Sequence, residues 1–282
     1  MSKVWFITGS SKGFGRVWAE AALERGDRVA ATARDASTLD ALVERYGSDA
    51  VLPLTLDVTN KAQVDATVAQ AAEHFGRLDV VINNAGYGHF GMIEEVTEDE
   101  ARAQLETNVF GALWVTQAAL PFMREQGSGH ILQVSSIGGV NAFPGIGLYH
   151  ASKWALEGFS TSLAGEVAEF GVRVTLIEPG GYSTDWRGPS SVTSEPLPAY
   201  AGVWEARNKQ WAQSLQMQGD PLATSDAIFA VVDAEQPPLR LFLGKVGLPM
   251  TRAEYERRIK EWEAWDDVAS AAQGEQKTEV SA

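Results

Sequence analysis

The chain has 282 residues, a hydrophobic fraction of 45% and a charged fraction of 21%, values typical of one large globular domain and far from those of disordered or membrane-spanning chains. Its formal net charge of −14 would repel a phosphate backbone, so we expect no nucleic-acid partner. The absence of Cys excludes disulfides, thiolate catalysis and Cys-ligated zinc.

Up to about residue 180, short apolar runs alternate with longer segments of helical period. This alternation is typical of βαβ units, and it predicts an α/β fold: a doubly wound parallel sheet of the Rossmann type, with helices on both faces. The predicted strands are residues 4–7, 28–33, 50–56, 78–82, 130–134 and 173–177. The predicted helices are residues 14–25, 37–46, 61–75, 98–123 and 149–170.

Beyond Gly180 the pattern changes, because residues 188–202 collect three Pro among Ser and Thr, which predicts a loop. Further along we expect a helix over 204–218, a last strand over 239–243 and a charged amphipathic helix over 252–268. The predicted organisation is a single domain over residues 1–250 with a substrate lid at about 185–225, a C-terminal helix within 251–272 and a disordered tail over 273–282.

No apolar run reaches the length of a signal peptide core or a membrane span. We therefore expect a cytoplasmic protein with no membrane partner. The four His show no metal-ligand spacing, so no metal site is expected.

A glycine-rich turn follows the first predicted strand and opens the first predicted helix. A dinucleotide pyrophosphate needs a tight turn, a backbone without a Cβ in its way, and free N–H groups at a helix N-terminus. Gly9, Gly13 and Gly15 meet these three needs. The alternative is a turn without a ligand, but the strand-turn-helix context favours a cofactor.

The end of the second predicted strand indicates which dinucleotide. NAD binders place a carboxylate there for the ribose 2′-hydroxyl, but this chain has Ala33 followed by Arg34. Asp35 is better explained as a helix N-cap. Arg34 and Lys12 are two cations where NAD would want an anion, which favours the 2′-phosphate of NADP over two solvated surface charges.

Tyr149 and Lys153 lie four residues apart at the start of a predicted helix, so their side chains share a face. A neighbouring ammonium stabilises the phenolate, and we expect it to lower the pKa of Tyr149 from its ordinary ~10. Ser136, just past a predicted strand, is placed to hydrogen-bond a substrate oxygen.

Taken together, these motifs resemble the short-chain dehydrogenase/reductase family, in its NADP-preferring type, and the central segment resembles the hydroxysteroid dehydrogenase branch. The motifs stand in the family's order over residues 3–184: Thr8-Gly9-x-x-x-Gly13-x-Gly15, Asp57-Val58, Asn83-Asn84-Ala85-Gly86, Asn108, Ser136, Tyr149-x-x-x-Lys153 and Pro179-Gly180-x-x-x-Thr184. The resemblance implies an NADP(H)-dependent enzyme that interconverts a ketone or aldehyde and an alcohol, with Tyr149 as general acid or base.

The resemblance also implies a role for each motif. The implied catalytic residues are Asn108, Ser136, Tyr149 and Lys153, with Asn108 holding a water that relays protons to Lys153. The implied cofactor-binding residues are Gly9, Ser11, Lys12, Gly13, Phe14, Gly15, Arg34, Asp57, Val58, Asn84, Ala85, Gly86, Tyr149, Lys153, Pro179, Gly180, Tyr182 and Thr184. Asn83 is expected to tie strands together.

Some of these residues have local alternatives. Asp57 could cap a helix, Asn108 could satisfy helix backbone at a bend, and Thr184 could be a turn residue. His150 is interpreted as structural or solvent-exposed.

Trp186, Trp204 and Trp211 flank the predicted Pro-rich loop within the lid and favour an apolar carbonyl or alcohol substrate, steroid-like or retinoid-like. We also expect a homo-oligomer, either a dimer or a tetramer. A function from another class is an NADP-binding regulatory protein without turnover. A missing Tyr, Lys or Ser would favour it, and none is missing.

Overall fold

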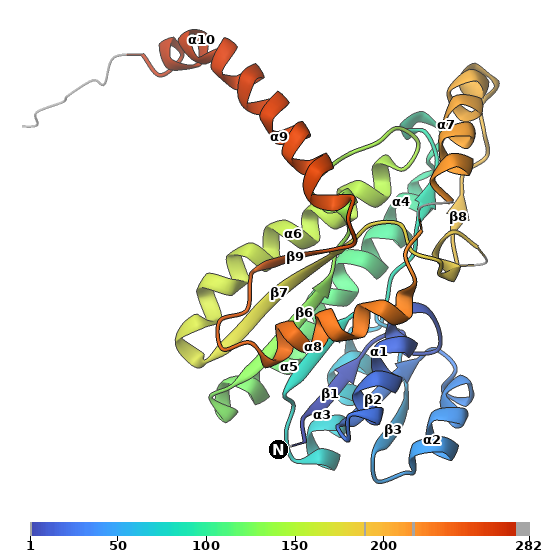
Figure 1. Cartoon of the computed structure of the whole chain (residues 1–282), viewed down its shortest axis with the longest axis vertical. Helices are drawn as coiled ribbons and strands as arrows, with labels where there is room; N and C mark the ends of the chain where they lie inside the picture. Colours follow the sequence, from blue (N-terminus) through green and yellow to red (C-terminus); the bar gives the residue numbers. More distant parts are fainter. Residues whose placement is uncertain (1, 189, 216–217, 275–282) are drawn as a thin grey trace, which may run out of the picture.

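The computed structural model describes residues 2–188, 190–215 and 218–274 and contains a seven-stranded sheet. All neighbouring strands in it are parallel, in the order β3-β2-β1-β4-β6-β7-β9 (Figure 1). The strands are β1 (Val4–Ile7), β2 (Arg28–Ala33), β3 (Val51–Thr55), β4 (Val80–Asn83), β6 (Gly129–Val134), β7 (Val172–Pro179) and β9 (Arg240–Leu243).

Helices cover both faces of this sheet, because successive side chains on each strand point to opposite sides. Val4 and Phe6 belong to one apolar cluster, and Trp5 and Ile7 belong to the other. The first cluster is completed by α3 (Lys61–Phe75), α5 (Ala112–Gln126) and α6 (Gly147–Val167), and the second by α1 (Gly13–Glu24), α2 (Asp40–Tyr46) and α8 (Ser225–Asp233). The predicted doubly wound parallel fold is confirmed.

The order of the strands creates the crevice in which such sheets bind ligands. From β1 the chain winds outward to β3, then returns to β4 on the other side of β1. The loops after β1 and β4 therefore diverge at the carboxyl ends of their strands, which is where open α/β sheets bind their ligands. Both loops carry predicted cofactor motifs.

Several elements differ from the prediction. The helix expected over 98–123 is divided into α4 (Glu98–Leu105), a π-helical segment (Glu106–Gly111) and α5. Helix α8 was not predicted at all, although it packs on α1, where the Trp18 indole N–H donates to Thr224 at 2.8 Å. Short 3-10 turns occupy Ala36–Leu39, Ile93–Glu95, Ile137–Gly139, Ala168–Phe170, Asp185–Arg187, Pro198–Tyr200 and Pro221–Thr224.

The region expected to be a loop over 188–202 contains a short strand. β8 (Val192–Thr193) pairs with β5 (His89–Phe90) in parallel, and α7 (Ala201–Ser214) follows it. Two backbone bonds hold the pair: Val192 donates to the Gly88 carbonyl at 3.0 Å, and Ser194 to the Phe90 carbonyl at 2.8 Å. A two-residue strand has no readable period, which is why the sequence did not reveal it.

The C-terminal helix begins earlier than predicted and is interrupted. α9 (Gly247–Ala264) ends before Trp265, and α10 (Asp266–Ala271) follows. Both lead away from the body of the molecule (Figure 1). The predicted disordered tail falls, from residue 275 on, outside the described residues. Within the described ranges, no helix is long and apolar enough to cross a membrane.

Candidate active site

The glycine loop between β1 and α1 has a structural reason for each of its three glycines. Gly9 and Gly13 have φ angles of 68° and 58°, in the left-handed region that favours glycine. A Cβ on Gly15 would collide with the carbonyl oxygen of Gly9 and lie 2.5 Å from Nδ2 of Asn84. The tight turn and the close packing of α1 against the loop both depend on these residues.

The N-terminus of α1 fits the pyrophosphate of a nicotinamide dinucleotide. The N-cap residue is Lys12, whose side chain makes no capping bond, and the first turn contains no acidic residue. A Cβ built on Gly13 would meet no described atom within 4 Å. Uncapped N–H groups beside open space at a helix N-terminus are the chemistry that binds a pyrophosphate.

The side chains of Asn84 and Thr8 connect this loop to the loop after β4 by hydrogen bonds. The Asn84 side chain donates to the carbonyls of Thr8 and Gly9, at 2.9 and 3.1 Å. The Thr8 hydroxyl accepts from the backbone N–H groups of Asn84 and Ala85, both at 2.9 Å. The sequence assigned Asn84 and Ala85 to the cofactor but gave Thr8 no role beyond its place in the motif.

Two exposed cations lie in the glycine loop and directly after β2. Ala33 is buried, and Arg34 and Lys12 are exposed. Within the described ranges neither cation has an ion-pair partner among the salt bridges of the structure. Asp35 accepts from the N–H and hydroxyl of Ser37, so its interpretation as a cap is confirmed.

The structure confirms the local alternative for Thr184, a turn residue, but not the one for Asp57, which does not cap the helix. Asp57 accepts from the N–H and hydroxyl of Thr59 at 3.0 and 2.8 Å, although the N-cap of α3 itself is Asn60. Thr184 accepts from the N–H of Trp186 at 3.4 Å, as a turn residue does. These bonds fix the two turns in which the side chains stand, and the roles of Asp57 and Thr184 toward a cofactor stay predictions.

Asn83 was expected to tie strands together, and this expectation is wrong. Its side chain donates to the Ala112 carbonyl at 3.3 Å and the Thr116 hydroxyl at 3.0 Å, so it fastens β4 to α5.

Tyr149 and Ser136 meet at the carboxyl end of β6. Tyr149 lies in the first turn of α6, and Ser136 stands in extended backbone immediately after the strand. The Ser136 oxygen accepts from the Gly138 N–H at 3.0 Å, and the Ser136 hydroxyl lies close enough to the phenol of Tyr149 to favour its phenolate form. The pair thus presents two hydroxyl groups to one place.

Lys153 departs from expectation in its bonding and in its effect on Tyr149. Its ammonium donates to the Val134 carbonyl at 2.7 Å and lies 5.8 Å from the centre of the Tyr149 ring. Burial raises the pKa of Tyr149 to about 12, only partly offset by the Ser136 bond, and lowers the pKa of Lys153 to about 8. The expected lowering of the pKa of Tyr149 is therefore wrong for this structure: desolvation outweighs an ammonium that is engaged elsewhere.

Asn108 lies in the π-helical segment and is buried beside Lys153. It donates to the Tyr87 carbonyl at 3.0 Å and the Ser152 hydroxyl at 3.1 Å, and accepts from the Tyr87 N–H at 3.1 Å. The Asn108 side chain therefore connects the π-helical segment to the loop after β4 and to α6. Within the described part of the chain, it makes no hydrogen bond to the backbone of its own helix. A Cβ on Gly86 would lie 3.0 Å from the Asn108 oxygen and 3.8 Å from the Lys153 nitrogen, so these two groups border the same space.

An aromatic cover lies over Tyr149, which is only 6% exposed. The rings of Tyr149 and Trp186 are 5.0 Å apart and edge to face, and Phe90 lies 5.5 Å from Trp186 and 4.8 Å from Trp211. Trp204 and Phe143 complete the cluster. A substrate must pass this cover to reach the Tyr149 hydroxyl.

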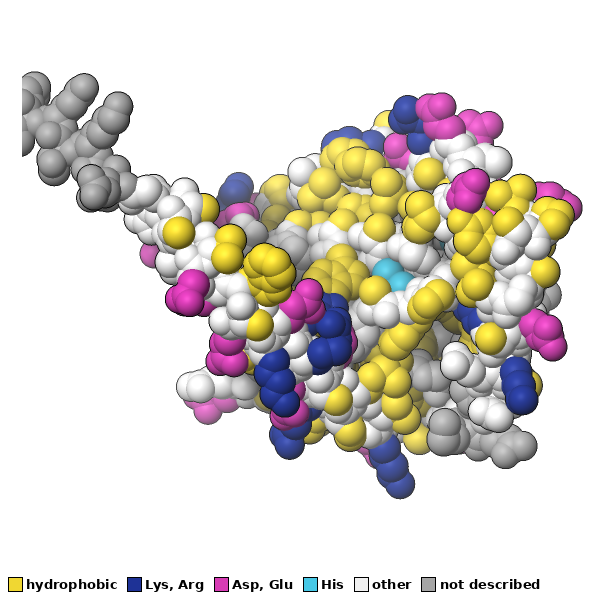
Figure 2. Space-filling model, turned by 90° about the horizontal axis from the view of Figure 1, so that it is seen from above, with side chains coloured by type: hydrophobic (Ala, Val, Ile, Leu, Met, Phe, Trp, Pro, Cys, Tyr) yellow, Lys and Arg dark blue, Asp and Glu magenta, His cyan; other side chains and the backbone are white. Residues whose placement is uncertain are grey.

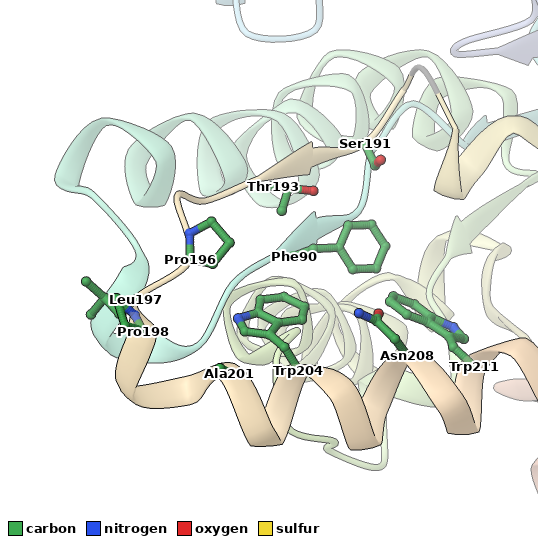
Figure 3. Close-up of a pocket in the computed structure, with 10 residues that line it drawn as sticks. All are labelled: Phe90, Ser191, Thr193, Pro196, Leu197, Pro198, Ala201, Trp204, Asn208 and Trp211. Carbon is green, nitrogen blue, oxygen red and sulfur yellow. The ribbon is translucent and has the colours of Figure 1, made fainter.

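A cavity of about 460 Å³ adjoins this cover between α7 and the strands β5 and β8 (Figure 3). Trp204 and Trp211 point from α7 toward Phe90 on β5, and the segment after β8 closes the far side. Glu95 anchors that segment, accepting from the Leu197 N–H at 3.0 Å and from the Trp204 indole. None of the four predicted catalytic residues is among the described residues that line the cavity.

His150 is buried, and its Nδ1 lies 2.9 Å from the Gly138 carbonyl. The structural interpretation is confirmed and the solvent-exposed one is wrong. Burial lowers the pKa of His150 to about 4, so the imidazole is neutral at pH 7.

Two buried glutamates that the sequence did not single out lie close together: Glu157, one helical turn beyond Lys153, and Glu178 on β7. Glu157 on α6 and Glu178 on β7 both face Arg240, whose Nε lies 2.9 Å from Glu157 and 3.6 Å from Glu178. No N–H or hydroxyl group of the described residues donates to Glu178. Burial, reinforced by the charge of Glu157, raises the pKa of Glu178 to about 8, so one proton stays on the pair at neutral pH.

We expect Glu178→Gln to stabilise the protein at high pH only. Because the folded pKa lies above the unfolded value of ~4.3, Glu178 carries no penalty below that value, and the penalty grows until the pH reaches the folded pKa. The melting temperature of Glu178→Gln should exceed that of the parent by roughly 5 °C more at pH 8 than at pH 5. Exposed Glu169→Gln is the control, and a pH-independent difference for Glu178→Gln would contradict a shared proton.

Known proteins resemble the chain over nearly its whole length. The profile of the short chain dehydrogenase family matches residues 3–194. Oxidoreductase BOA17 of Botryotinia fuckeliana is 43% identical over 276 residues, covering 96% of this chain and 100% of that one. The 3-ketodihydrosphingosine reductase of Bacteroides thetaiotaomicron is 37% identical over 271 residues, covering 91% and 97%. A solved short-chain dehydrogenase from Streptomyces avermitilis is 41% identical with a TM-score of 0.88, covering 96% and 98%.

Proposed function

Because the chain belongs to the short-chain dehydrogenase/reductase family, we propose that it is an NADP(H)-dependent oxidoreductase that interconverts a ketone or aldehyde and an alcohol, with Tyr149 as general acid or base. The observation that carries this proposal is the convergence of Ser136, Tyr149, Lys153 and Asn108 under an aromatic cover at the carboxyl end of the sheet.

Each of these groups has a chemical task in the proposed reaction. Bound at the glycine loop, the nicotinamide dinucleotide supplies or accepts a hydride. Ser136 holds the substrate oxygen by a hydrogen bond. Tyr149, whose high pKa keeps the phenol protonated at pH 7, gives that oxygen a proton during reduction. In the reverse reaction the phenolate would accept the proton.

In the proposed reaction, Lys153 and Asn108 supply Tyr149 with protons. Lys153 has a pKa lowered to about 8 by burial, so its ammonium is close to releasing a proton at neutral pH. In the proposed mechanism it holds the nicotinamide ribose and passes a proton toward Tyr149. Asn108 borders the same space beside Gly86, where a water would connect Lys153 to solvent.

The surroundings of Tyr149 support an apolar carbonyl substrate. The cover consists of the rings of Trp186, Phe90 and Trp211, and the adjoining cavity beside α7 offers further apolar wall. The name of the Bacteroides relative specifies a keto group and its reduction, which supports a ketone. We propose a ketone or aldehyde with a sizeable apolar portion, of which steroid-like and retinoid-like compounds are examples.

Oxidation of NADPH with a panel of apolar ketones, aldehydes and quinones tests this function. Turnover of at least one carbonyl compound, with the alcohol as product, is expected. Tight NADPH binding without turnover of any of them would favour the regulatory protein, although Ser136, Tyr149 and Lys153 are all present and brought together.

NADP(H) should bind more tightly than NAD(H), because Arg34 after β2 and Lys12 in the glycine loop are exposed cations that the proposal assigns to the ribose 2′-phosphate. A charge-assisted contact to phosphate contributes roughly 1.5–3 kcal/mol, which corresponds to about a 10- to 150-fold preference. Arg34→Ala should remove most of this preference while leaving NAD(H) affinity unchanged. Titration of both cofactors measures it, with Arg45→Ala, on the exposed far end of α2, as the control. Equal affinities of the parent protein for NADP(H) and NAD(H) would show that Arg34 and Lys12 do not discriminate between the two cofactors.

A further inference from the structure

Helix α9 contacts the body of the protein only through its first three turns. Thr251 accepts from the Asn141 side chain at 2.8 Å, and the Arg258 guanidinium lies 5.1 Å from the centre of the Trp154 ring. From Ile259 to Gly274 every described residue is exposed. The second half of α9 and all of α10 therefore form an arm that leads away from the body and packs on no other part of the described chain (Figure 1).

Helix α9 carries an apolar stripe that begins in its first turn and runs into this arm. Leu248, Tyr255, Ile259 and Trp262 follow one another at intervals of seven, four and three residues, which places them on one side of the helix. They are 55%, 38%, 46% and 64% exposed. Beyond the end of α9, Trp265 and Val268 are 65% and 61% exposed, and Figure 2 shows yellow side chains spaced along the arm.

The stripe is large enough for a small protein interface. Its four side chains at these exposures present on the order of 500 Å² of apolar surface, so two copies would bury about 1,000 Å², the lower end of the range for specific interfaces. A helix without tertiary packing is marginal in water at this length. A second surface that covers the stripe would supply the packing that the arm does not obtain from its own chain.

The charges of the arm argue against a lipid surface. Residues 247–271 contain four cations and six acidic groups, so the arm is net negative like the chain as a whole. Two of the cations, Arg257 and Arg258, are already paired with Glu254 on the same helix. Anionic membranes attract arms with an excess of Lys and Arg, which this one lacks.

We propose that the apolar stripe of α9 binds the same stripe of a second copy of this chain. A two-fold pairing needs a patch that is complementary to itself, and an uncharged stripe meets that condition without burying a charge. In an antiparallel crossing centred on Ile259, Tyr255 of each copy would face Trp262 of the other. The proposal does not depend on the proposed catalytic function.

The mass of the full-length protein in solution tests this pairing. At about 10 µM we expect twice the chain mass for the parent by light scattering after gel filtration, and a single chain for Ile259→Glu/Trp262→Glu. The matched control is Ala253→Glu/Ala264→Glu, which puts two carboxylates on the exposed opposite side of α9 and should remain dimeric. A monomeric parent, a dimeric stripe variant or a monomeric control would each overturn the proposal.

A second measurement holds even if the stripe variant folds poorly. Because the chain contains no Cys, a single introduced thiol reports only its own contacts. Under mild oxidation Ile259→Cys should form a disulfide-linked dimer, and Ala253→Cys should not. Equal cross-linking of both would refute a pairing centred on the stripe. So would binding of the parent, as a monomer, to phosphatidylserine vesicles, which would assign the stripe to a membrane.

Discussion

Tyr149→Phe should lower turnover by ~10²–10⁴ and leave NADPH affinity nearly unchanged. The substitution keeps the ring that packs edge to face on Trp186 at 5.0 Å, but it removes the hydroxyl that Ser136 bonds. No group then exchanges a proton with the substrate oxygen. Steady-state rates with the best carbonyl substrate, together with an NADPH titration, separate chemistry from binding.

A matched control for this substitution is Tyr87→Phe. Tyr87 is held in the same region through its backbone, by Asn108, so loss of its phenol oxygen should leave turnover within a few-fold of the parent. Near-parental turnover of Tyr149→Phe would disprove the assigned mechanism. His150 is a poor replacement acid, because burial keeps its imidazole neutral at pH 7.

The pH dependence gives an independent check on Tyr149. Alcohol oxidation needs the phenolate as the base, but a phenol with a pKa near 12 is protonated at pH 7. The rate of oxidation should therefore rise with pH up to at least 10. Reduction uses the protonated phenol and should not gain over that range. A plateau of oxidation already at pH 7 would show that bound cofactor brings the pKa far below its value in this structure.

Lys153→Met should reduce both turnover and NADPH affinity, unlike Tyr149→Phe. We expect at least ~100-fold slower turnover and roughly 10-fold weaker binding, because the proposed ribose contact and a proton-transferring group are lost together. Met has a similar length and leaves no buried charge behind. The Val134 carbonyl, which now accepts from the ammonium at 2.7 Å, loses its donor, at a cost of roughly 1–3 kcal/mol in stability.

The control for Lys153→Met is Lys61→Met, an exposed lysine that is paired with Asp65. It should leave binding and turnover unchanged. NADPH affinity that is equal in Lys153→Met and the parent would show that Lys153 does not hold the cofactor, and would leave it only the proposed role in proton transfer.

Local patterns of the sequence determined the sheet and most of its helices. Strand β1 reads as an uninterrupted apolar run because both of its faces are covered, with Val4 and Phe6 on one side and Trp5 and Ile7 on the other. The glycine loop was recognisable for a similar reason. Its tight turn is a local feature that favours glycine at Gly9 and Gly13, and the Gly9 carbonyl six residues earlier leaves no room for a Cβ on Gly15.

Only the tertiary structure decided what surrounds the predicted catalytic residues. The cover of Trp186 on Tyr149, the bond of Lys153 to Val134 and the pairing of β5 with β8 join segments far apart in the chain. No periodicity records such contacts. The pKa of Tyr149 illustrates this difference. The spacing of Tyr149 and Lys153 in the sequence favoured a lower pKa, whereas burial, which depends on the whole fold, raises it.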